Sequence, residues 1–192
     1  MLKDLDQMTV FLGKHKTTVH SEPHEKIFNV KVVRFHIRYN IPTVHNNDLA
    51  LIELKRPAED KYRPICLPQR KDKYLPNTVL TIAGWGGNHE SSPLNHFLQK
   101  ADMNVLSYDA CKAKYPQWFN KRMICVRNEE VDACKGDGGA PLMRLHEGRY
   151  YLAGVASWNS TQGCRNQGEP RVFSAVPSSL IWISNRVKLD VA

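Results

Sequence analysis

The chain has 192 residues, of which 42% are hydrophobic and 24% are charged, with 11 Gly and 11 Pro. These values fit one globular domain with a sizeable core and exclude a disordered, collagen-like or coiled-coil protein. No apolar run approaches the roughly 18 residues that cross a bilayer, and residues 1–7 are acidic and mixed, so we expect no membrane span and no signal peptide here. Lys and Arg outnumber Asp and Glu by 27 to 19, and the net charge of +8 favours an anionic partner without naming one.

Most apolar segments are short and rich in β-branched or aromatic residues, and clusters of Gly, Pro, Asn and Ser separate them. Many short strands with turn signals between them are typical of an all-β barrel or sandwich. The clearest predicted strands cover residues 8–12, 27–37, 49–54, 79–83, 150–157 and 171–176.

The end of the chain has a different pattern. Ser178 and Ser179 are suitable N-cap residues, and Leu180, Ile183 and Val187 recur at helical spacing after them. We therefore expect a short terminal helix over residues 179–188 that packs on the β body.

The five cysteines indicate an oxidised, extracellular protein rather than a metal site. They lie at positions 66, 111, 125, 134 and 164, without a C-x-x-C pair or zinc-type spacing, so we expect no metal and no cofactor. A bridge that closes a loop of about 15 residues stabilises by roughly 3 kcal/mol, which suits Cys111 with Cys125. An odd cysteine in a secreted protein indicates a bond to another chain or a missing segment. Five reduced thiols in a cytosolic protein remain the alternative.

The most specific stretch covers residues 132–142 and reads DACKGDGGAPL. Three Gly and an Asp beside a Cys indicate a tight turn whose backbone amides can point into a pocket. Further short motifs accompany it along the chain. They are NDLALI at 47–52, PICLP at 64–68, AGWG at 83–86 and GVASW at 154–158.

In this order and spacing, the motifs resemble the trypsin/chymotrypsin family of serine proteases, and above all its regulatory branch in coagulation, complement and arthropod immune cascades. The resemblance implies two six-stranded β-barrels, the first incomplete here, with the active site between them and a C-terminal helix. It implies one domain over 1–192, with the remainder of the first barrel in 1–70, the second barrel in 71–178 and the helix in 179–188.

The resemblance also assigns the cysteines. It pairs Cys111 with Cys125 and Cys134 with Cys164. Cys66 matches the cysteine that tethers the protease domain to an upstream chain in multidomain relatives, so we expect an interchain disulfide there.

The departures from the family pattern matter more than the match. A working protease of this kind needs a nucleophilic Ser, a His that takes its proton and an Asp that orients the His. Asp48 matches the Asp, but the family motif GDSGGP reads GDGGAP at 136–141, so Gly138 stands at the nucleophile position and Ala140 replaces a Gly. Gly136 and Gly138 can still supply oxyanion-hole amides. Two changes in one motif favour natural loss of activity over a laboratory knockout.

The family's histidine belongs to an AAHC motif that we expect to precede everything in this chain. His15, His36 and His45 lie outside such a context and are expected to be ordinary surface or packing residues. The N-terminal ammonium that pairs with Asp137 after activation is also expected to be absent. Asp137 is then expected to be an unpaired, partly buried carboxylate with zymogen-like disorder around it.

The substrate pocket is altered as well. Asp132 matches the pocket-floor acid of enzymes that cleave after Arg or Lys, and Ser157 and Trp158 match the pocket entrance. Asn159 and Arg171 each replace a Gly of the pocket wall. We expect the Arg171 guanidinium to reach the Asp132 carboxylate and plug the pocket; the alternative is an Arg171 turned outward into solvent.

Asn159 also begins NST, the one N-glycosylation sequon of the chain, so a glycan at the mouth of the pocket is a further hypothesis.

Three functions compete. The first is a non-catalytic protease homologue, a secreted binding module that docks on a protease, zymogen or receptor of a cascade through loops or basic clusters at 70–73, 112–115 and 121–122. The second is an endopeptidase, as a fragment or inactivated form, that cleaves after Arg or Lys. The third is a binder of polyanions such as glycosaminoglycans, which predicts salt-sensitive heparin retention through Lys71 and Lys73. Nucleic acid is not an expected partner. We favour the first.

Overall fold

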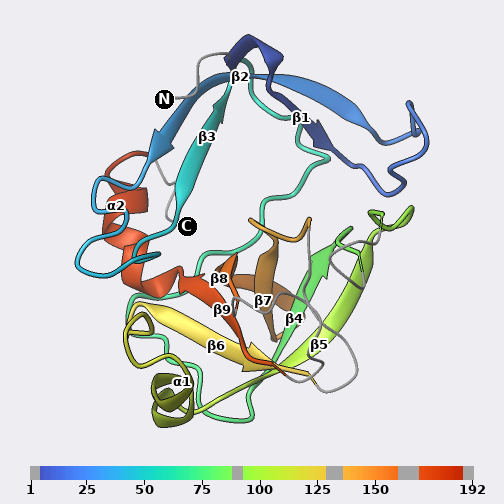
Figure 1. The fold of residues 1–192 in the computed structure, drawn as a ribbon. Coiled ribbons are helices and arrows are strands. Elements are labelled where there is room, and N and C mark those ends of the chain that lie inside the picture. Colours follow the sequence, from blue (N-terminus) through green and yellow to red (C-terminus); the bar gives the residue numbers. More distant parts are fainter. Residues whose placement is uncertain (1–4, 88–92, 129–135, 160–168, 188–192) are drawn as a thin grey trace.

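The computed structural model of the chain describes residues 5–87, 93–128, 136–159 and 169–187. Its strands form two separate bodies, a three-stranded sheet in the order β1-β2-β3 and a closed barrel in the order β4-β5-β6-β9-β8-β7 (Figure 1). The strands are β1 Thr9–Leu12, β2 Lys26–Phe35, β3 Ala50–Leu54, β4 Val79–Gly84, β5 Gln99–Val105, β6 Met123–Arg127, β7 Pro141–His146, β8 Arg149–Trp158 and β9 Arg171–Ala175. This arrangement confirms the predicted all-β fold with an incomplete first barrel.

The barrel holds most of the buried apolar side chains. Alternate residues of its strands point inward, as the period of two in a β-strand requires. They form one continuous core that draws on every strand of the barrel. Its members are Leu80, Ile82, Met103, Val105, Ile124, Val126, Leu142, Ala153, Phe173 and Ala175.

A short helix, α1 (Tyr108–Lys114), covers one side of the barrel. Its sequence carries the signals that place it: Ser107 is the N-cap, and its side chain accepts a hydrogen bond from the Ala110 amide. Cys111, the buried residue of α1, forms a disulfide with Cys125 of β6. This confirms the Cys111–Cys125 pairing and ties α1 to the barrel wall.

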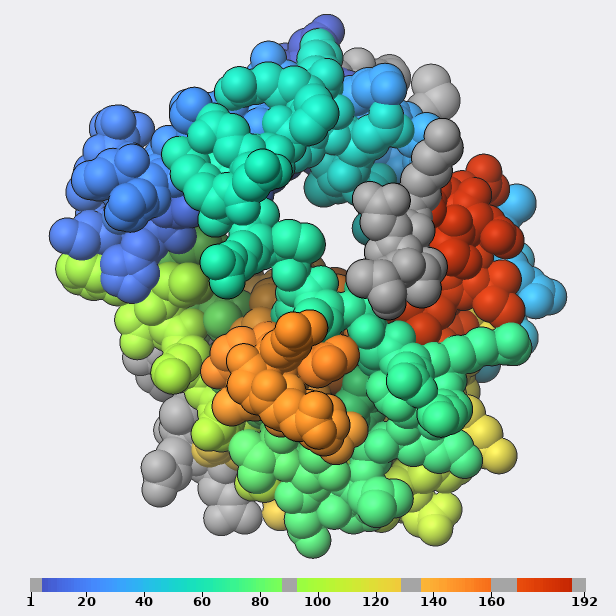
Figure 2. All heavy atoms as spheres, turned by 180° about the vertical axis from the view of Figure 1, so that it is seen from behind, coloured from blue at the N-terminus to red at the C-terminus, as the bar shows by residue number. Residues whose placement is uncertain are grey.

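The three-stranded sheet is less well covered. Phe11 lies opposite Ile27 in the β1–β2 pair, and an irregularity between Val30 and Val32 shifts the register of β2 against β3. Ile52 of β3 lies opposite Val33 and is 48% exposed. Seen from behind, the molecule has an opening between this sheet and the barrel, beside the teal segment that follows β3 (Figure 2).

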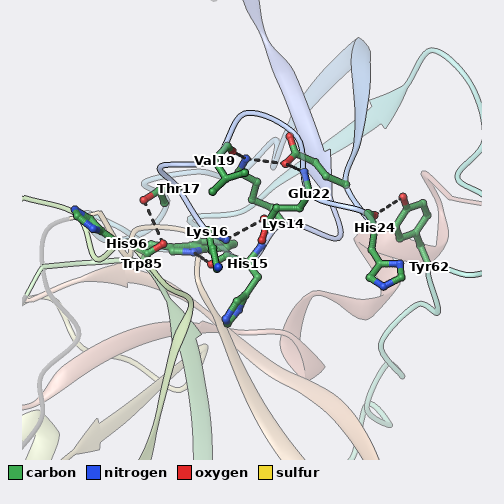
Figure 3. A network of polar contacts seen from close by, with 11 residues as sticks. Lys14, His15, Lys16, Thr17, Val19, Glu22, His24, Tyr62, Trp85 and His96 are labelled. Atoms are coloured by element: carbon green, nitrogen blue, oxygen red, sulfur yellow. Dashed lines mark hydrogen bonds and ion pairs between the residues drawn. The ribbon is translucent and has the colours of Figure 1, made fainter.

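The loop between β1 and β2 attaches the sheet to the barrel. The His15 carbonyl accepts a hydrogen bond from Trp85 Nε1 at 3.0 Å, and Thr17 lies against His96, whose carbonyl accepts from the Thr17 amide at 2.9 Å (Figure 3). The His15 carbonyl also accepts from the Leu98 amide at 2.8 Å. Within the loop, Lys14 Nζ lies 2.7 Å from the Glu25 carboxylate.

The C-terminal segment begins differently from the prediction. Pro177–Ser179 forms a 3-10 turn, and the helix α2 covers Leu180–Ser184 rather than the whole of 179–188. Ser179 is its N-cap, but its side chain makes no capping hydrogen bond. Pro177 stands at the start of the turn, a position that tolerates proline because the first amides of a helix have no intrahelical partner. No described helix is both long and apolar enough for a membrane span.

Candidate functional site

The site lies where the loop before β3 meets the barrel. Asp48 Oδ2 accepts a hydrogen bond of 2.7 Å from Ser157 Oγ near the end of β8, across 109 positions of sequence. Both side chains are half-buried. Asp48 and Ser157 were each predicted as site residues, but their direct contact was not, since only the fold brings these two segments together.

Asn47, directly before Asp48, holds its loop against the barrel. Asn47 Oδ1 accepts a hydrogen bond of 2.6 Å from Arg122 Nε, and the same guanidinium donates to the Ser178 carbonyl at 2.7 Å. Asn46 and Asn47 are both buried, and Asn47 has a φ of 54°, in the left-handed region where Asn is more tolerated than most residues. The Arg122 guanidinium therefore joins the Asp48 loop, the barrel and the start of α2. Sequence analysis placed Arg122 only in a basic cluster.

The GDGGAP turn lies beside this contact and is anchored by its own Asp. Asp137 Oδ1 accepts a hydrogen bond of 2.8 Å from the Gly86 amide. A side chain at either Gly84 or Gly86 would collide with the Asp137 carboxylate, because a Cβ there would lie 2.1 Å or 2.0 Å from its oxygens. The expectation of an unpaired Asp137 is therefore wrong: the GWG segment supplies a backbone donor and leaves room for the carboxylate.

Gly138 has open space around it. A Cβ built at this position would meet nothing within 4 Å, so the surrounding structure does not require a glycine there. Neither the Gly136 nor the Gly138 amide donates a hydrogen bond to a described residue.

A cavity of about 110 Å³ adjoins the turn. Its walls come from the GDGGAP turn, the end of β8 and the start of β9. They are formed by Asp137, Gly138, Ala156, Ser157, Trp158, Asn159, Arg171, Val172 and Phe173. The structure thus brings the predicted Ser157, Trp158, Asn159 and Arg171 together around one small cavity.

Arg171 points into the protein. It is 2% exposed and lines the cavity, so the alternative of an outward-facing Arg171 is wrong. The neighbouring Tyr115 donates its hydroxyl to the Pro170 carbonyl at 2.9 Å. Burial, together with the Glu169 carboxylate, raises the pKa of Tyr115 to about 12, so its phenol stays neutral beside Arg171. Asp132, Cys134 and Cys164 lie outside the described residues, as does any contact they make.

The histidines occupy packing positions, which agrees with the prediction for them. His45 stacks on Trp158 with ring centroids 5.6 Å apart, and His36 packs against Trp182 of α2 at 4.7 Å. His15 meets the edge of Phe97. Among the described residues, the hydrogen-bond partner of the Asp48 carboxylate is Ser157 and no histidine.

Burial and the nearby guanidinium groups of Arg122 and Arg38 lower the pKa of His36. Its Nδ1 accepts a hydrogen bond from the Arg38 amide, which requires that nitrogen to be unprotonated.

The remaining cysteine, Cys66, is a free thiol and is half-buried. Its backbone pairs with the first residues of β8, since its amide donates to the Tyr150 carbonyl at 3.1 Å and its carbonyl accepts from the Leu152 amide at 2.9 Å. Within the described ranges, no three His, Cys, Asp or Glu side chains gather as they would to hold a metal ion.

Comparison with known proteins gives the family. A family model described as Trypsin matches residues 2–183. The "Suppressor of tumorigenicity 14 protein homolog" of Bos taurus is 34% identical over 184 residues, which cover 93% of this chain and 21% of that protein. The "Urokinase-type plasminogen activator" of Gallus gallus is 35% identical over 190 residues, which cover 93% of this chain and 43% of that protein. The chain spans less than half the length of either relative, and by the family match it belongs to the trypsin family of serine proteases.

Proposed function

We propose that this chain is a non-catalytic member of the trypsin family, a secreted binding or regulatory module of a proteolytic cascade such as coagulation, complement or innate immunity. One observation carries the proposal: a glycine stands at position 138, beside a preserved Asp48–Ser157 contact, where the family has its nucleophilic serine. A residue without a side chain cannot form an acyl-enzyme. The cleft therefore retains its framework and lacks the atom that attacks.

The residual chemistry of such a cleft is small. Asp48 is the vestigial triad acid, and the Gly136 and Gly138 amides form the oxyanion-hole-like pair, a role supported by their lack of other partners among the described residues. In a related serine protease, loss of the serine alone costs about a millionfold in turnover. The remaining donors hold a carbonyl group without cleaving it.

The substrate pocket is proposed to be closed by the protein's own side chain. Buried Arg171 occupies the wall of a cavity of about 110 Å³ that Ser157, Trp158 and Asn159 also line. We propose that its guanidinium pairs with Asp132 in place of a substrate side chain. An Asp132→Asn substitution would then leave a buried charge without its partner and destabilise the protein.

The partner is proposed to be another protein, a protease, zymogen or receptor of the cascade. Cys66, a free and half-buried thiol, is the proposed site of a disulfide to an upstream chain. Asn159 lines the mouth of the closed pocket, where a glycan would further block access. Intact-mass measurement before and after glycosidase treatment tests the glycan directly.

Two alternatives are separated by direct assays. An endopeptidase that cleaves after Arg or Lys requires a hydroxyl at position 138, and it predicts turnover of arginyl peptides. A glycosaminoglycan binder is favoured by the net charge of +8 and predicts retention on heparin that falls steeply with salt. Reversing the charges of Lys71 and Lys73 then weakens retention, and unchanged retention excludes that patch.

The test of the main proposal is hydrolysis of fluorogenic peptides with Arg or Lys before the scissile bond. The purified chain is expected to give no turnover above the buffer rate, at any concentration and after repeated chromatography. Gly138→Ser serves as the matched variant, because the open space at this position accepts the new side chain without rearrangement. Turnover by the unsubstituted chain that follows its concentration through purification would overturn the proposal.

A further inference from the structure

A second cavity, four times larger than the first, lies elsewhere in the barrel. It has a volume of about 420 Å³, against about 110 Å³ for the cleft cavity, and no residue lines both. Its volume falls in the range of roughly 300–1,000 Å³ that is typical of small-ligand pockets. The paired strands β6 and β9 each face a different cavity. Val172 and Phe173 of β9 line the cleft cavity, whereas their β6 partners Cys125 and Ile124 line the second cavity.

The walls of this cavity are apolar and partly aromatic. They come from the end of β5, the start of α1, β6 and the segment after β9. The apolar and aromatic lining residues include Val105, Leu106, Tyr108, Phe119, Met123 and Pro177. Tyr108 and Phe119 form a tilted ring pair with centroids 5.6 Å apart, in which Phe119 is buried and Tyr108, 41% exposed, offers its ring to a ligand.

The walls are also held rigidly before any ligand arrives. The Cys111–Cys125 disulfide joins α1 to β6 across 14 residues. Lys112 Nζ donates a hydrogen bond of 2.9 Å to the Phe119 carbonyl, which fixes the loop that carries Phe119. A preformed cavity binds more tightly than one that must be ordered, because the ordering cost is already met by the fold.

Two lysines that are distant in sequence meet at this cavity. Lys73 comes from the basic cluster at 70–73 and Lys121 from the cluster at 121–122, and both side chains are exposed lining residues. Neither has an ion-pair or hydrogen-bond partner among the described residues. By contrast, the ammonium groups of Lys112 and Lys114 are used internally, the second by Glu169 at 2.8 Å.

The negative groups at the cavity compete only weakly with an anionic ligand for the two lysines. Among the described residues, Asp72 is the one carboxylate that lines it, and its Oδ2 already accepts a hydrogen bond of 2.9 Å from the Gln69 amide. Burial, assisted by Asp72, raises the pKa of the lining residue Tyr74 to about 12, so its phenol carries no charge at neutral pH. Two ammonium groups therefore face one carboxylate, and the balance of charge at the mouth is positive.

We propose that this cavity is a binding site for a small aromatic anion, a planar apolar ring bearing one carboxylate or sulfonate group. The ring packs against Tyr108 and the apolar lining residues, and the anionic group lies near Lys73 and Lys121. This site is separate from the cleft, so the proposal does not depend on whether position 138 can support catalysis.

Isothermal titration with 2-naphthoate tests the proposal, with 15N–1H NMR to locate the bound ligand. We expect saturable one-site binding with amide shifts in residues 105–108 and 119–125. The double variant Lys73→Gln, Lys121→Gln is expected to weaken binding by at least about tenfold, since charge-assisted contacts are among the strongest a surface site makes. Tyr108→Ala is expected to weaken it by about threefold to tenfold through loss of the ring contact.

The matched control removes the same charge from the same surface. Arg70→Gln, Lys71→Gln changes exposed neighbours that do not line the cavity and is expected to leave the affinity unchanged. The proposal is overturned by absence of saturable binding, by equal loss in the control, by equally tight binding of neutral 2-naphthylmethanol, or by shifts confined to residues 27–37. Binding of sucrose octasulfate without binding of 2-naphthoate would also overturn it, because a charge-only site needs no ring.

Discussion

The barrel and the three-stranded sheet are built from similar strands but differ in how completely they bury them. The barrel closes on itself, so every strand has two neighbours and its core residue Leu142 is 0% exposed. The sheet keeps two edges, and its Ile52 and Phe35 are 48% and 60% exposed. Because the barrel closes on itself, its core provides most of the hydrophobic stabilisation. The three-stranded sheet depends on the contacts that attach it to the barrel.

This difference bears on the cleft, because the two bodies contribute unequally to it. The barrel supplies Ser157, Arg171 and the GDGGAP turn, whereas Asp48 comes from the loop that leads into β3 of the sheet. The attachments that hold that loop and its sheet in place include the Arg122 hydrogen bonds to Asn47 and Ser178, the hydrogen bonds Ser157–Asp48 and Asn120–Thr43, and the contacts of the 13–25 loop. The pocket is thus expected to be rigid and the position of Asp48 to depend on a few polar contacts.

The largest expected effect separates the two bodies by truncating one apolar residue in each, the buried Leu142 of the barrel and the half-exposed Ile52 of the sheet. Leu142→Ala is expected to reduce the free energy of unfolding by about 2–5 kcal/mol, because the side chain is fully buried and leaves a cavity. Ile52→Ala, in the half-exposed sheet, is expected to cost less than about 1 kcal/mol. Urea unfolding of both variants measures the difference. Equal losses of unfolding free energy in the two variants would contradict the inference that the barrel buries its strands more completely than the sheet does.

The next effect comes from the disulfide. Replacing both Cys111 and Cys125 by Ala is expected to cost about 3 kcal/mol, since the bridge closes a short loop of the chain and restricts the unfolded state. Cys66→Ala is the matched control and is expected to change stability by less than about 1 kcal/mol. Thermal and urea unfolding measure both. A double variant as stable as the control would show that the fold alone holds α1 in place.

A third prediction concerns the attachment of the Asp48 loop. Arg122→Met keeps much of the side-chain volume but loses the hydrogen bonds to Asn47 and to the Ser178 carbonyl, and it is expected to cost about 1–3 kcal/mol. Hydrogen exchange at residues 43–49 is expected to accelerate more than exchange in the barrel. Arg149→Met, on an exposed strand end, is the control. Uniform acceleration across the chain would mean that Arg122 has no special role at this contact.

The smallest effect is a dependence on pH at the same junction. The pKa of His36 lies below its usual value of 6.5 in the folded protein, so between the two values the unfolded chain binds the extra proton. The contribution of neutral His36 is therefore fully present above about pH 6.5 and is lost as the pH falls. His36→Phe, which keeps a ring against Trp182, is expected to flatten the stability profile between pH 5 and 7. His146→Gln, on the surface, is the control, and an equal effect of the two would remove His36 as the cause.

Sequence reasoning found six of the nine described strands and missed β5, β6 and β7, although four of the five residues of β6 are buried. β1, β2, β3, β4, β8 and β9 overlap predicted segments within a few residues. β5 was not predicted because polar residues fill its outer face, and β7 because it begins with Pro141 and places Arg144 and His146 outward. The missed helix α1 buries Cys111 alone, so its apolar pattern is too weak to be seen.

The candidate site depended on the family resemblance more than on local pattern. Asp48 and Ser157 lie 109 residues apart, and nothing in either segment indicates the other. The donor to Asp137 could not be predicted because it is a backbone amide, which leaves no side-chain signal beyond the two glycines that make room for the carboxylate. Arg171 could be assigned to the pocket by its motif, but its burial required the fold.

The most direct measurement is the intact mass of the chain after reaction with a fluorophosphonate that modifies activated serines. We predict no added mass for the unsubstituted chain, because position 138 carries no hydroxyl to accept the phosphonyl group. Stoichiometric labelling that maps to a residue lining the cleft would contradict the account, since the cleft would then hold an activated nucleophile although position 138 is a glycine.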